Sequence, residues 1–126
     1  MPETLELTPW INGAALPLDG RATTTVLDPY RRVPAALAAE ATAADLEQAI
    51  TAAQAGFRAM RALPRHARRD LLARVADALT RDRQALGAEL AASCGKPIGQ
   101  ALGEVDRAII TFSFAADETR RFGGEM

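Results

Sequence analysis

Large apolar residues recur at every third or fourth position through the last quarter of the chain. The members of this series are Ile98, Leu102, Val105, Ile109, Phe112 and, more weakly, Ala116. Residues at this spacing lie on one face of an α-helix. Gly95 and Pro97 end the pattern before it, because glycine accepts a positive φ and proline cannot continue a helix. The sequence therefore predicts a helix that begins at about residue 98 and ends at Gly123–Gly124.

Three shorter amphipathic patterns precede this helix. The first predicts a helix over residues 42–61, with Thr42 as its N-cap and Asp45 placed to reach back to the start. The second and third predict helices over residues 66–80 and 82–93, the latter capped by its first residue, an aspartate. The apolar face of the first helix contains Leu46, Ile50, Ala53, Phe57 and Met60. We expect each of these faces to be buried.

The region before the helices is predicted to be extended. Residues 10–16 contain an Asn12–Gly13 pair between short apolar flanks, which is typical of a tight β-hairpin. Residues 23–27 are rich in β-branched side chains and predict a strand. Residues 33–40 predict a further short strand, although the alanines in this segment weaken that prediction.

Composition and charge narrow the class of protein. Of the 126 residues 48% are hydrophobic and 25% charged, as in ordinary globular domains. The net charge of −1 argues against a nucleic-acid partner or an anionic membrane surface. The chain opens without a basic and apolar leader, and no apolar run approaches the roughly 20 residues of a membrane span. A single cysteine excludes an internal disulfide. We expect a cytoplasmic protein.

A series of short motifs follows in a characteristic order. The motifs are Asn12-Gly13, Asp28-Pro29, Thr42 to Asp45, Arg68 to Leu72, Ala76-Asp77, Cys94-Gly95-Lys96-Pro97, Glu104 and Phe114-Ala115-Ala116. This succession resembles the N-terminal quarter of the NAD(P)-dependent aldehyde dehydrogenase superfamily. The resemblance implies an α/β fold of which only the N-terminal part is present. That part comprises an extended β-arm with its hairpin over residues 1–41, and four mostly amphipathic helices over residues 42–126 that belong to an incomplete cofactor-binding domain without a complete Rossmann sheet.

The resemblance also implies a chemistry. Members of this superfamily oxidise an aldehyde to a carboxylic acid with a cysteine thiolate, pass hydride to NAD or NADP, and hydrolyse the thioester with a glutamate-activated water. In the family these residues and the cofactor site follow the matched segment. We therefore expect a fragment or truncated form with no catalytic, cofactor-binding or metal-binding residue of its own, inactive by itself and binding no cofactor alone.

One set of positions is implied as a site in the full-length context only. The last helix of the matched segment runs beside the substrate-entry tunnel in the family, which places Val105, Ala108 and Phe112 in the tunnel wall. The same positions belong to the apolar stripe of that helix, so periodicity alone equally predicts them to be core residues.

Other candidate site residues have simpler interpretations. Cys94, the only thiol, lies at a predicted helix C-terminus, where the helix dipole disfavours the thiolate that a nucleophile requires. The Gly-Lys pair at 95–96 is not a phosphate loop, because Leu90 and Pro97 occupy positions that require Gly and Ser or Thr. His66, the only histidine, is interpreted as a solvated residue at a helix start rather than a general base.

Two repeated residue types remain. Gly95, Gly99 and Gly103 leave one edge of the last helix nearly bare, and we expect another element to pack closely there, with a bound ligand as the alternative. Six arginines lie between residues 58 and 74 with only Asp70 to balance them. No aromatic side chain lies among them for base stacking, so we interpret them as a solvated face or as ion pairs within an oligomer, and not as a nucleic-acid site.

The partners of this chain follow from its apolar faces. In the family these helices pack against a cofactor-binding sheet that this sequence lacks, so we expect a rearranged helical bundle, a homo-oligomer with the last helix at the interface, or a missing C-terminal remainder of the enzyme. No nucleic acid and no membrane are expected. Two alternatives to an enzyme fragment are a non-enzymatic helical oligomerisation or interaction module, and one half of a split enzyme that is complemented in trans.

Overall fold

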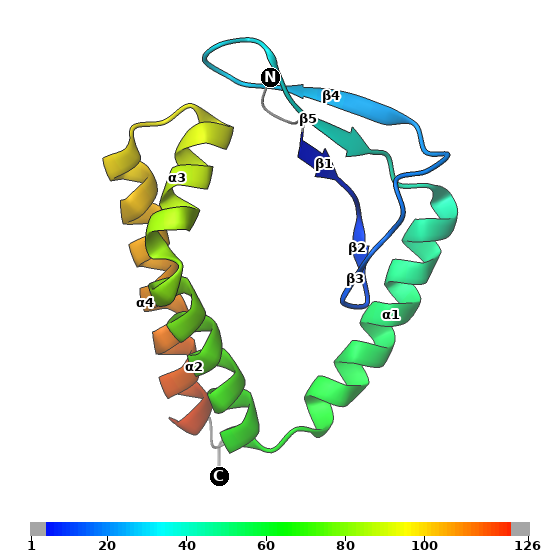
Figure 1. Ribbon diagram of the computed structural model, residues 1–126. Helices are drawn as coiled ribbons and strands as arrows, with labels where there is room; N and C mark the ends of the chain where they lie inside the picture. The colour runs from blue at the N-terminus through cyan, green and yellow to red at the C-terminus, as the bar shows by residue number, and fades with distance from the viewer. Residues whose placement is uncertain (1–4, 122–126) are drawn as a thin grey trace. The chain divides into compact units, whose positions relative to one another are not determined.

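The computed structural model describes residues 5–121, which fall into two compact units (Figure 1). The strand–helix unit is Met1–Arg61, and the three-helix unit is Ala62–Met126. Their boundary lies at the end of the first helix. The predicted division into domains after residue 41 stays a prediction.

A small mixed sheet occupies the strand–helix unit. Its strands are β1 (Leu5–Leu7), β4 (Thr23–Leu27) and β5 (Pro34–Ala39), in the order β1-β5-β4. β5 pairs parallel with β1 and antiparallel with β4 (Figure 1). The strands predicted over residues 23–27 and 33–40 are confirmed. β1 was not predicted, because three residues are too few to show an alternating pattern.

The predicted hairpin is confirmed. β2 (Trp10–Ile11) pairs antiparallel with β3 (Ala14–Ala15) across the two residues Asn12 and Gly13. Both turn residues have positive φ, 53° and 78°. This is the type I′ conformation, whose twist matches that of the flanking strands and which Asn-Gly favours.

Helix α1 (Ala43–Ala62) begins at the predicted reciprocal cap. The Asp45 backbone N–H donates to Thr42 Oγ1 at 3.2 Å, and the Thr42 backbone N–H donates to Asp45 Oδ2 at 2.7 Å. Arg21 adds two donors to the same carboxylate, at 2.6 Å and 3.0 Å, and a third to the Glu40 carbonyl at 3.2 Å. The start of α1 is therefore fixed to the sheet by polar contacts.

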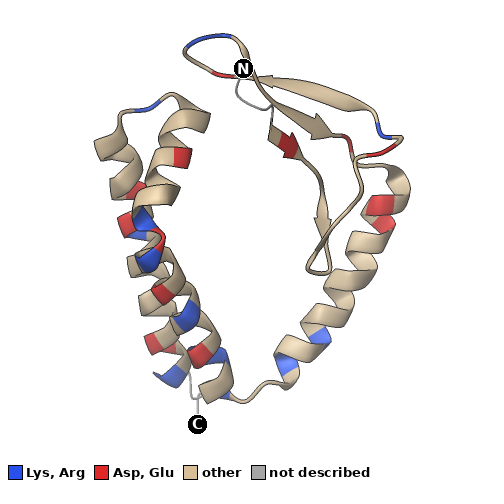
Figure 2. Ribbon diagram, in the orientation of Figure 1, with Lys and Arg blue, Asp and Glu red and all other residues tan. Residues whose placement is uncertain are grey.

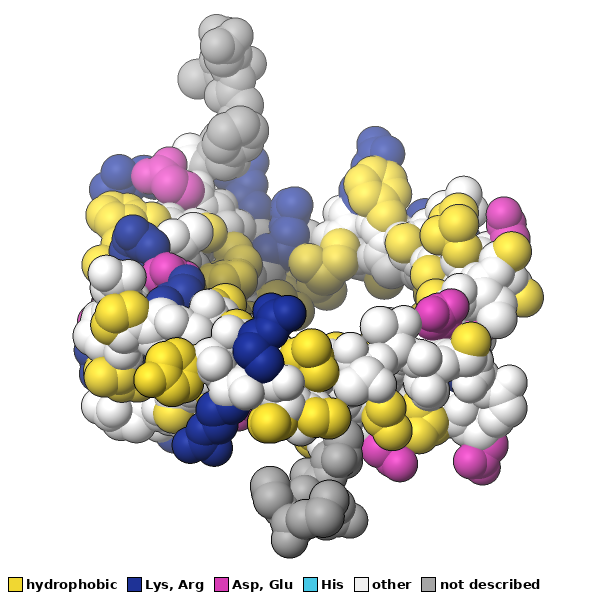
Figure 3. Space-filling view, turned by 90° about the horizontal axis from the view of Figure 1, so that it is seen from above, with side chains coloured by type: hydrophobic (Ala, Val, Ile, Leu, Met, Phe, Trp, Pro, Cys, Tyr) yellow, Lys and Arg dark blue, Asp and Glu magenta, His cyan; other side chains and the backbone are white. Residues whose placement is uncertain are grey.

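The apolar face of α1 is exposed, contrary to expectation. Leu46, Ile50, Phe57 and Met60 are between 42% and 63% exposed. Hydrophobic side chains accordingly appear at the surface in the space-filling view (Figure 3). The pattern predicted the helix correctly, but the elements in residues 5–121 supply no cover for its apolar side.

The three-helix unit contains α2 (Arg65–Arg81), α3 (Arg83–Cys94) and α4 (Ile98–Arg121). α2 and α3 both pack against α4 (Figure 1). The predicted helices are confirmed to within a residue or two. The predicted end of the last helix at Gly123–Gly124 lies outside the described residues.

Small side chains form the core of this unit. Ala76 of α2 and Ala101, Val105 and Ala116 of α4 are its buried hydrophobic residues, with Ala101 fully buried. Gly87 of α3 is also buried, and a Cβ at that position would lie 2.5 Å from Leu102 Cδ2. The missing side chain lets α3 and α4 approach closely.

Polar contacts define the ends of α3. Gly95 adopts the predicted left-handed conformation, with φ of 67°, and its N–H donates to the Ala91 carbonyl at 2.9 Å. Asp82 occupies the predicted N-cap position of α3, but its side chain makes no capping hydrogen bond, so that part of the prediction was wrong. Its carboxylate instead accepts two hydrogen bonds from Arg81, at 2.9 Å and 2.8 Å. The neighbouring Arg83 joins α3 to α4 through a bidentate pair with Asp106, at 2.6 Å and 2.7 Å.

Candidate functional site

The three predicted tunnel residues lie along one side of α4. Val105 is 7% exposed, and Ala108 and Phe112 are half-buried. Val105 and Ala108 line an apolar surface groove to which α2 and α3 also contribute. The other residues of this groove are Leu79, Leu86, Leu90 and Glu104. The structure thus brings two of the three residues together at an apolar groove, and their place in a tunnel wall stays a prediction.

Cys94 is the last residue of α3 and is exposed. Its Sγ lies 3.8 Å from Ser93 Oγ. The nearby Lys96 donates to Glu104 Oε1 at 2.7 Å, and this hydrogen bond raises the pKa of Lys96 and lowers that of Glu104. The lysine charge is therefore engaged with a carboxylate of α4. Within residues 5–121 no histidine or carboxylate is hydrogen-bonded to the thiol as a general base would be.

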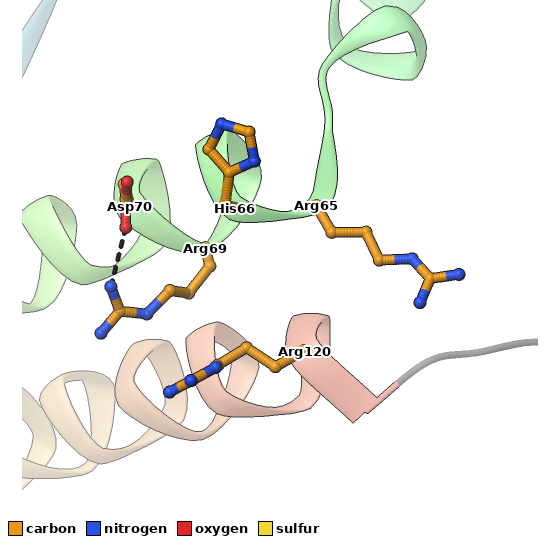
Figure 4. Close-up of a pocket in the computed structure, with 5 residues that line it drawn as sticks. All are labelled: Arg65, His66, Arg69, Asp70 and Arg120. Carbon is orange, nitrogen blue, oxygen red and sulfur yellow. Dashed lines mark hydrogen bonds and ion pairs between the residues drawn. The ribbon is translucent and has the colours of Figure 1, made fainter.

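His66 lies at the start of α2 and lines a cationic pocket (Figure 4). The other lining residues are Arg65, Arg69 and Asp70 of α2 and Arg120 of α4. Arg69 donates to Asp70 Oδ1 at 2.8 Å. Sequence reasoning recognised the arginines of α2 but missed Arg120, because only the pairing of α2 with α4 brings that residue to them.

The bare edge of α4 has no neighbour within the described chain. A Cβ at Gly99 or Gly103 would meet no atom within 4 Å. The expectation of close packing at these glycines was therefore wrong for the part of the chain that the structure describes. The close contact between helices occurs instead at Gly87, where sequence periodicity gave no signal.

The described residues offer neither a metal site nor a membrane-spanning helix. Residues 5–121 contain no group of three or more His, Cys, Asp or Glu side chains arranged to hold a metal ion. Over the same range, no helix combines the length and apolar character that a membrane crossing demands.

The fold and sequence match one family of proteins. The profile of the "Aldehyde dehydrogenase family" matches residues 18–126. The chain is 32% identical over 101 residues to aspartate-semialdehyde dehydrogenase 1 of Pseudomonas canavaninivorans, covering 80% of this chain and 22% of that protein. It is 32% identical over 100 residues to 3-sulfolactaldehyde dehydrogenase of Priestia megaterium, covering 79% of this chain and 20% of that protein.

Solved structures of aldehyde dehydrogenases share the fold of this chain. Aldehyde dehydrogenase 21 of Physcomitrella patens, in complex with the reaction product succinate, matches with a TM-score of 0.89 and 32% identity, over 98% of this chain and 25% of its own. Lactaldehyde dehydrogenase of Escherichia coli matches with a TM-score of 0.90 over 98% of this chain and 26% of its own, at 23% identity, which shows the fold alone.

These matches decide the fold class. The expected α/β fold of aldehyde dehydrogenases, represented by its N-terminal part, is confirmed. The expectation that the isolated chain forms a rearranged helical bundle or a homo-oligomer stays a prediction. The chain spans about a fifth to a quarter of the length of the proteins that it matches. It belongs to the aldehyde dehydrogenase family.

Proposed function

We propose that this chain acts as the N-terminal portion of an NAD(P)-dependent enzyme that oxidises an aldehyde to a carboxylic acid, and that by itself it has no such activity. The observation that carries this proposal is the family match over residues 18–126 by a chain that spans about a quarter of the solved relatives. A cytoplasmic location belongs to the same proposal.

The geometry around Cys94 supports the proposal of inactivity. A catalytic cysteine requires a lowered pKa or an adjacent base, and an oxyanion donor beside it. Cys94 lies at the C-terminal end of α3, where the helix dipole is negative. Lys96, the nearby cation, is paired with Glu104. The described residues around this thiol thus lack the groups that would activate it.

The N-terminus of α1 does not fit a dinucleotide. A dinucleotide cradle needs a glycine-rich turn between a strand and a helix, whose free N–H groups bind the pyrophosphate. The residues between β5 and α1 are Glu40, Ala41 and Thr42, and the Asp45 carboxylate lies against Thr42 at the helix start. That carboxylate would repel a pyrophosphate. NAD or NADP would therefore bind to residues other than these in a longer enzyme.

The identity of the aldehyde does not follow from the relatives. The names of the matching proteins specify aspartate semialdehyde, 3-sulfolactaldehyde and lactaldehyde, which differ in charge and size. We therefore propose the reaction class and no particular substrate. Val105, Ala108 and Phe112 are the residues of this chain that would contribute to a tunnel wall.

An assay of cofactor reduction tests the proposal. The purified chain is mixed with NAD or NADP and with lactaldehyde or aspartate semialdehyde, and we expect no aldehyde-dependent reduction. Turnover that is lost in Cys94→Ser and retained in the neighbouring Ser93→Ala would contradict it. In a separate experiment, a second chain that carries the family's cysteine and glutamate is added. Activity that appears only in the mixture would indicate a split enzyme.

A second candidate function has a specific observation in its favour. Exposed apolar side chains lie on α1, at Leu46 and Phe57, and on α4, at Ile110 and Phe114. A shallow apolar groove also runs along α1 beside Ile50. Such surfaces are typical of protein interaction sites, so a non-enzymatic oligomerisation module is the alternative. The oligomeric state of the chain, measured by analytical ultracentrifugation, tests this alternative. A monomer at micromolar concentration would contradict the homo-oligomer.

A further inference from the structure

The cationic pocket of the three-helix unit carries an unusual excess of positive charge. It is lined by three arginines, Arg65, Arg69 and Arg120, against the single carboxylate of Asp70. Asp70 pairs with Arg69 alone. Neither Arg65 nor Arg120 forms an ion pair with another residue in the range 5–121. The lining residues thus carry a net charge of +2. One of the two unpaired positive charges, that of Arg120, lies between the helices, and the other, that of Arg65, points away from them (Figure 4).

The start of α2 adds to this excess. Acidic residues are favoured in the first turn of a helix, because its N-terminus is the positive end of the dipole. The first turn of α2 instead contains Arg65 and His66 and no acidic residue. Its N-cap is Pro64, which makes no side-chain hydrogen bond to the helix. Arg65 and His66 therefore lie at the positive end of the helix dipole, where an anionic group is electrostatically favoured.

Two of the arginines converge from different helices. In Figure 4, Arg69 of α2 and Arg120 of α4 extend toward the same region between the two helices, whereas Arg65 points the other way. The Nε atom of Arg69 is buried without a hydrogen-bond partner in the described chain. Arg65 is exposed and lines the pocket from the start of α2.

We propose that this pocket binds a phosphate group. Guanidinium groups recognise phosphate oxygens through paired, charge-assisted hydrogen bonds. A phosphate monoester carries nearly two negative charges at neutral pH, and the unpaired guanidinium groups of Arg120 and Arg65 carry two positive charges. Arg69 and Arg120 hold the anion between the helices, and Arg65 and the N-terminus of α2 complete the site. The ligand is free phosphate or the phosphate group of a small metabolite.

A titration monitored by NMR tests this proposal. The isotope-labelled full chain is titrated with inorganic phosphate and, separately, with glycerol 3-phosphate, at constant ionic strength maintained with chloride. We expect saturable shifts of the backbone amides of residues 65–69 and of the side-chain N–H of Arg120. The ligand that binds more tightly identifies the source of the phosphate group. Shifts that rise without saturation for both ligands would overturn the proposal.

Matched variants separate a site from general electrostatics. Arg120→Gln is expected to weaken binding about tenfold, equivalent to roughly 1.4 kcal/mol. Arg65→Gln, in the other helix, is expected to act in the same direction. The control is Arg107→Gln, which removes the same charge from an exposed position of α4 and should leave affinity unchanged. Equal losses in Arg107→Gln and Arg120→Gln would overturn the proposal, and circular dichroism verifies that all variants retain the same helix content.

Discussion

The three-helix unit and α1 place their apolar side chains in opposite ways. In the three-helix unit, Ala101 and Val105 of α4 are buried against neighbouring helices. In α1, Leu46 and Phe57 lie on a regular apolar face that is 59% and 63% exposed at these residues. Both patterns are equally helical in the sequence. The difference is that α4 has two helices beside it in this chain, whereas the apolar side of α1 has no cover among the described residues.

The charged residues are also distributed differently on α1 and on the three-helix unit. α1 has Asp45 in its first turn and Arg61 in its last, which complements the helix dipole, and its middle is largely uncharged (Figure 2). The three-helix unit carries charges of both signs along its length (Figure 2). Its Arg83–Asp106 ion pair joins α3 to α4, and its Lys96–Glu104 ion pair joins the loop between these helices to α4. Polar contacts thus hold α1 at its start, whereas ion pairs in the three-helix unit hold α3 and the loop after it to α4.

The largest expected effect lies at the close contact of α3 with α4. Gly87→Val inserts side-chain atoms where even a Cβ would lie 2.5 Å from Leu102 Cδ2. We expect a loss of about 1–3 kcal/mol in the free energy of unfolding, because overpacking forces side chains and backbone to shift. Urea denaturation followed by circular dichroism measures it. The control is Gly103→Ala, which meets open space and should stabilise α4 by about 0.5–1 kcal/mol.

Removing the N-cap of α1 should have an effect of about 1 kcal/mol. Thr42→Ala deletes the hydroxyl that accepts the Asp45 N–H. Amide exchange in the first turn of α1 should accelerate, while exchange in α2–α4 stays constant. Thr51→Ala, an exposed position within α1, serves as the control and should not accelerate exchange. Unchanged protection of the first turn in Thr42→Ala would show that the cap contributes nothing.

Acidification should weaken the attachment of α1 to the sheet. Hydrogen bonds from Arg21 and Thr42 hold the pKa of Asp45 far below its ordinary value of about 3.9. A carboxyl group with a depressed pKa stabilises the fold above its unfolded pKa, and that contribution is lost as pH falls below about 4 toward the folded value. The urea concentration at the unfolding midpoint of the strand–helix unit should therefore decrease as the pH is lowered from about 5 to about 2. Asp45→Asn should flatten this dependence, and an unaltered pH profile in that variant would count against the role of Asp45.

The smallest effect is expected on the exposed face of α1. Phe57→Ser removes a side chain that is already 63% exposed, so stability should change by no more than about 0.5 kcal/mol. Val105→Ala, at a buried position of α4, should cost about 2 kcal/mol. Thermal denaturation of both variants compares the two regions directly. Similar losses at the two positions would mean that the face of α1 is covered in solution.

Local signals predicted most of the secondary structure. The apolar spacing located all four helices, Asn12–Gly13 located the hairpin, and Thr42 with Asp45 located the start of α1. Each of these features depends on residues that are close in sequence. The family resemblance added the fold, because the order of many weak motifs is informative even where each motif alone is not.

The features that sequence reasoning missed depend on contacts between distant residues. Gly87 carries no local sign that Leu102 will lie against it. Arg120 joins the arginines of α2 only through the pairing of α2 with α4. The Asp82 side chain had two partners available, and it binds the neighbouring guanidinium of Arg81 in place of the helix N-terminus. The exposure of the apolar face of α1 likewise could not follow from periodicity, which predicts a face but not what covers it.

Hydrogen–deuterium exchange of the native chain tests the contrast between the two regions most directly. Exchange rates report local opening, and helices without tertiary cover open readily. The amides of α4 around Ala101 and Val105 should exchange far more slowly than those of α1 between Ile50 and Phe57. Equal protection of the two helices in the chain by itself would contradict the account, because it would require a cover over α1 that residues 5–121 do not supply.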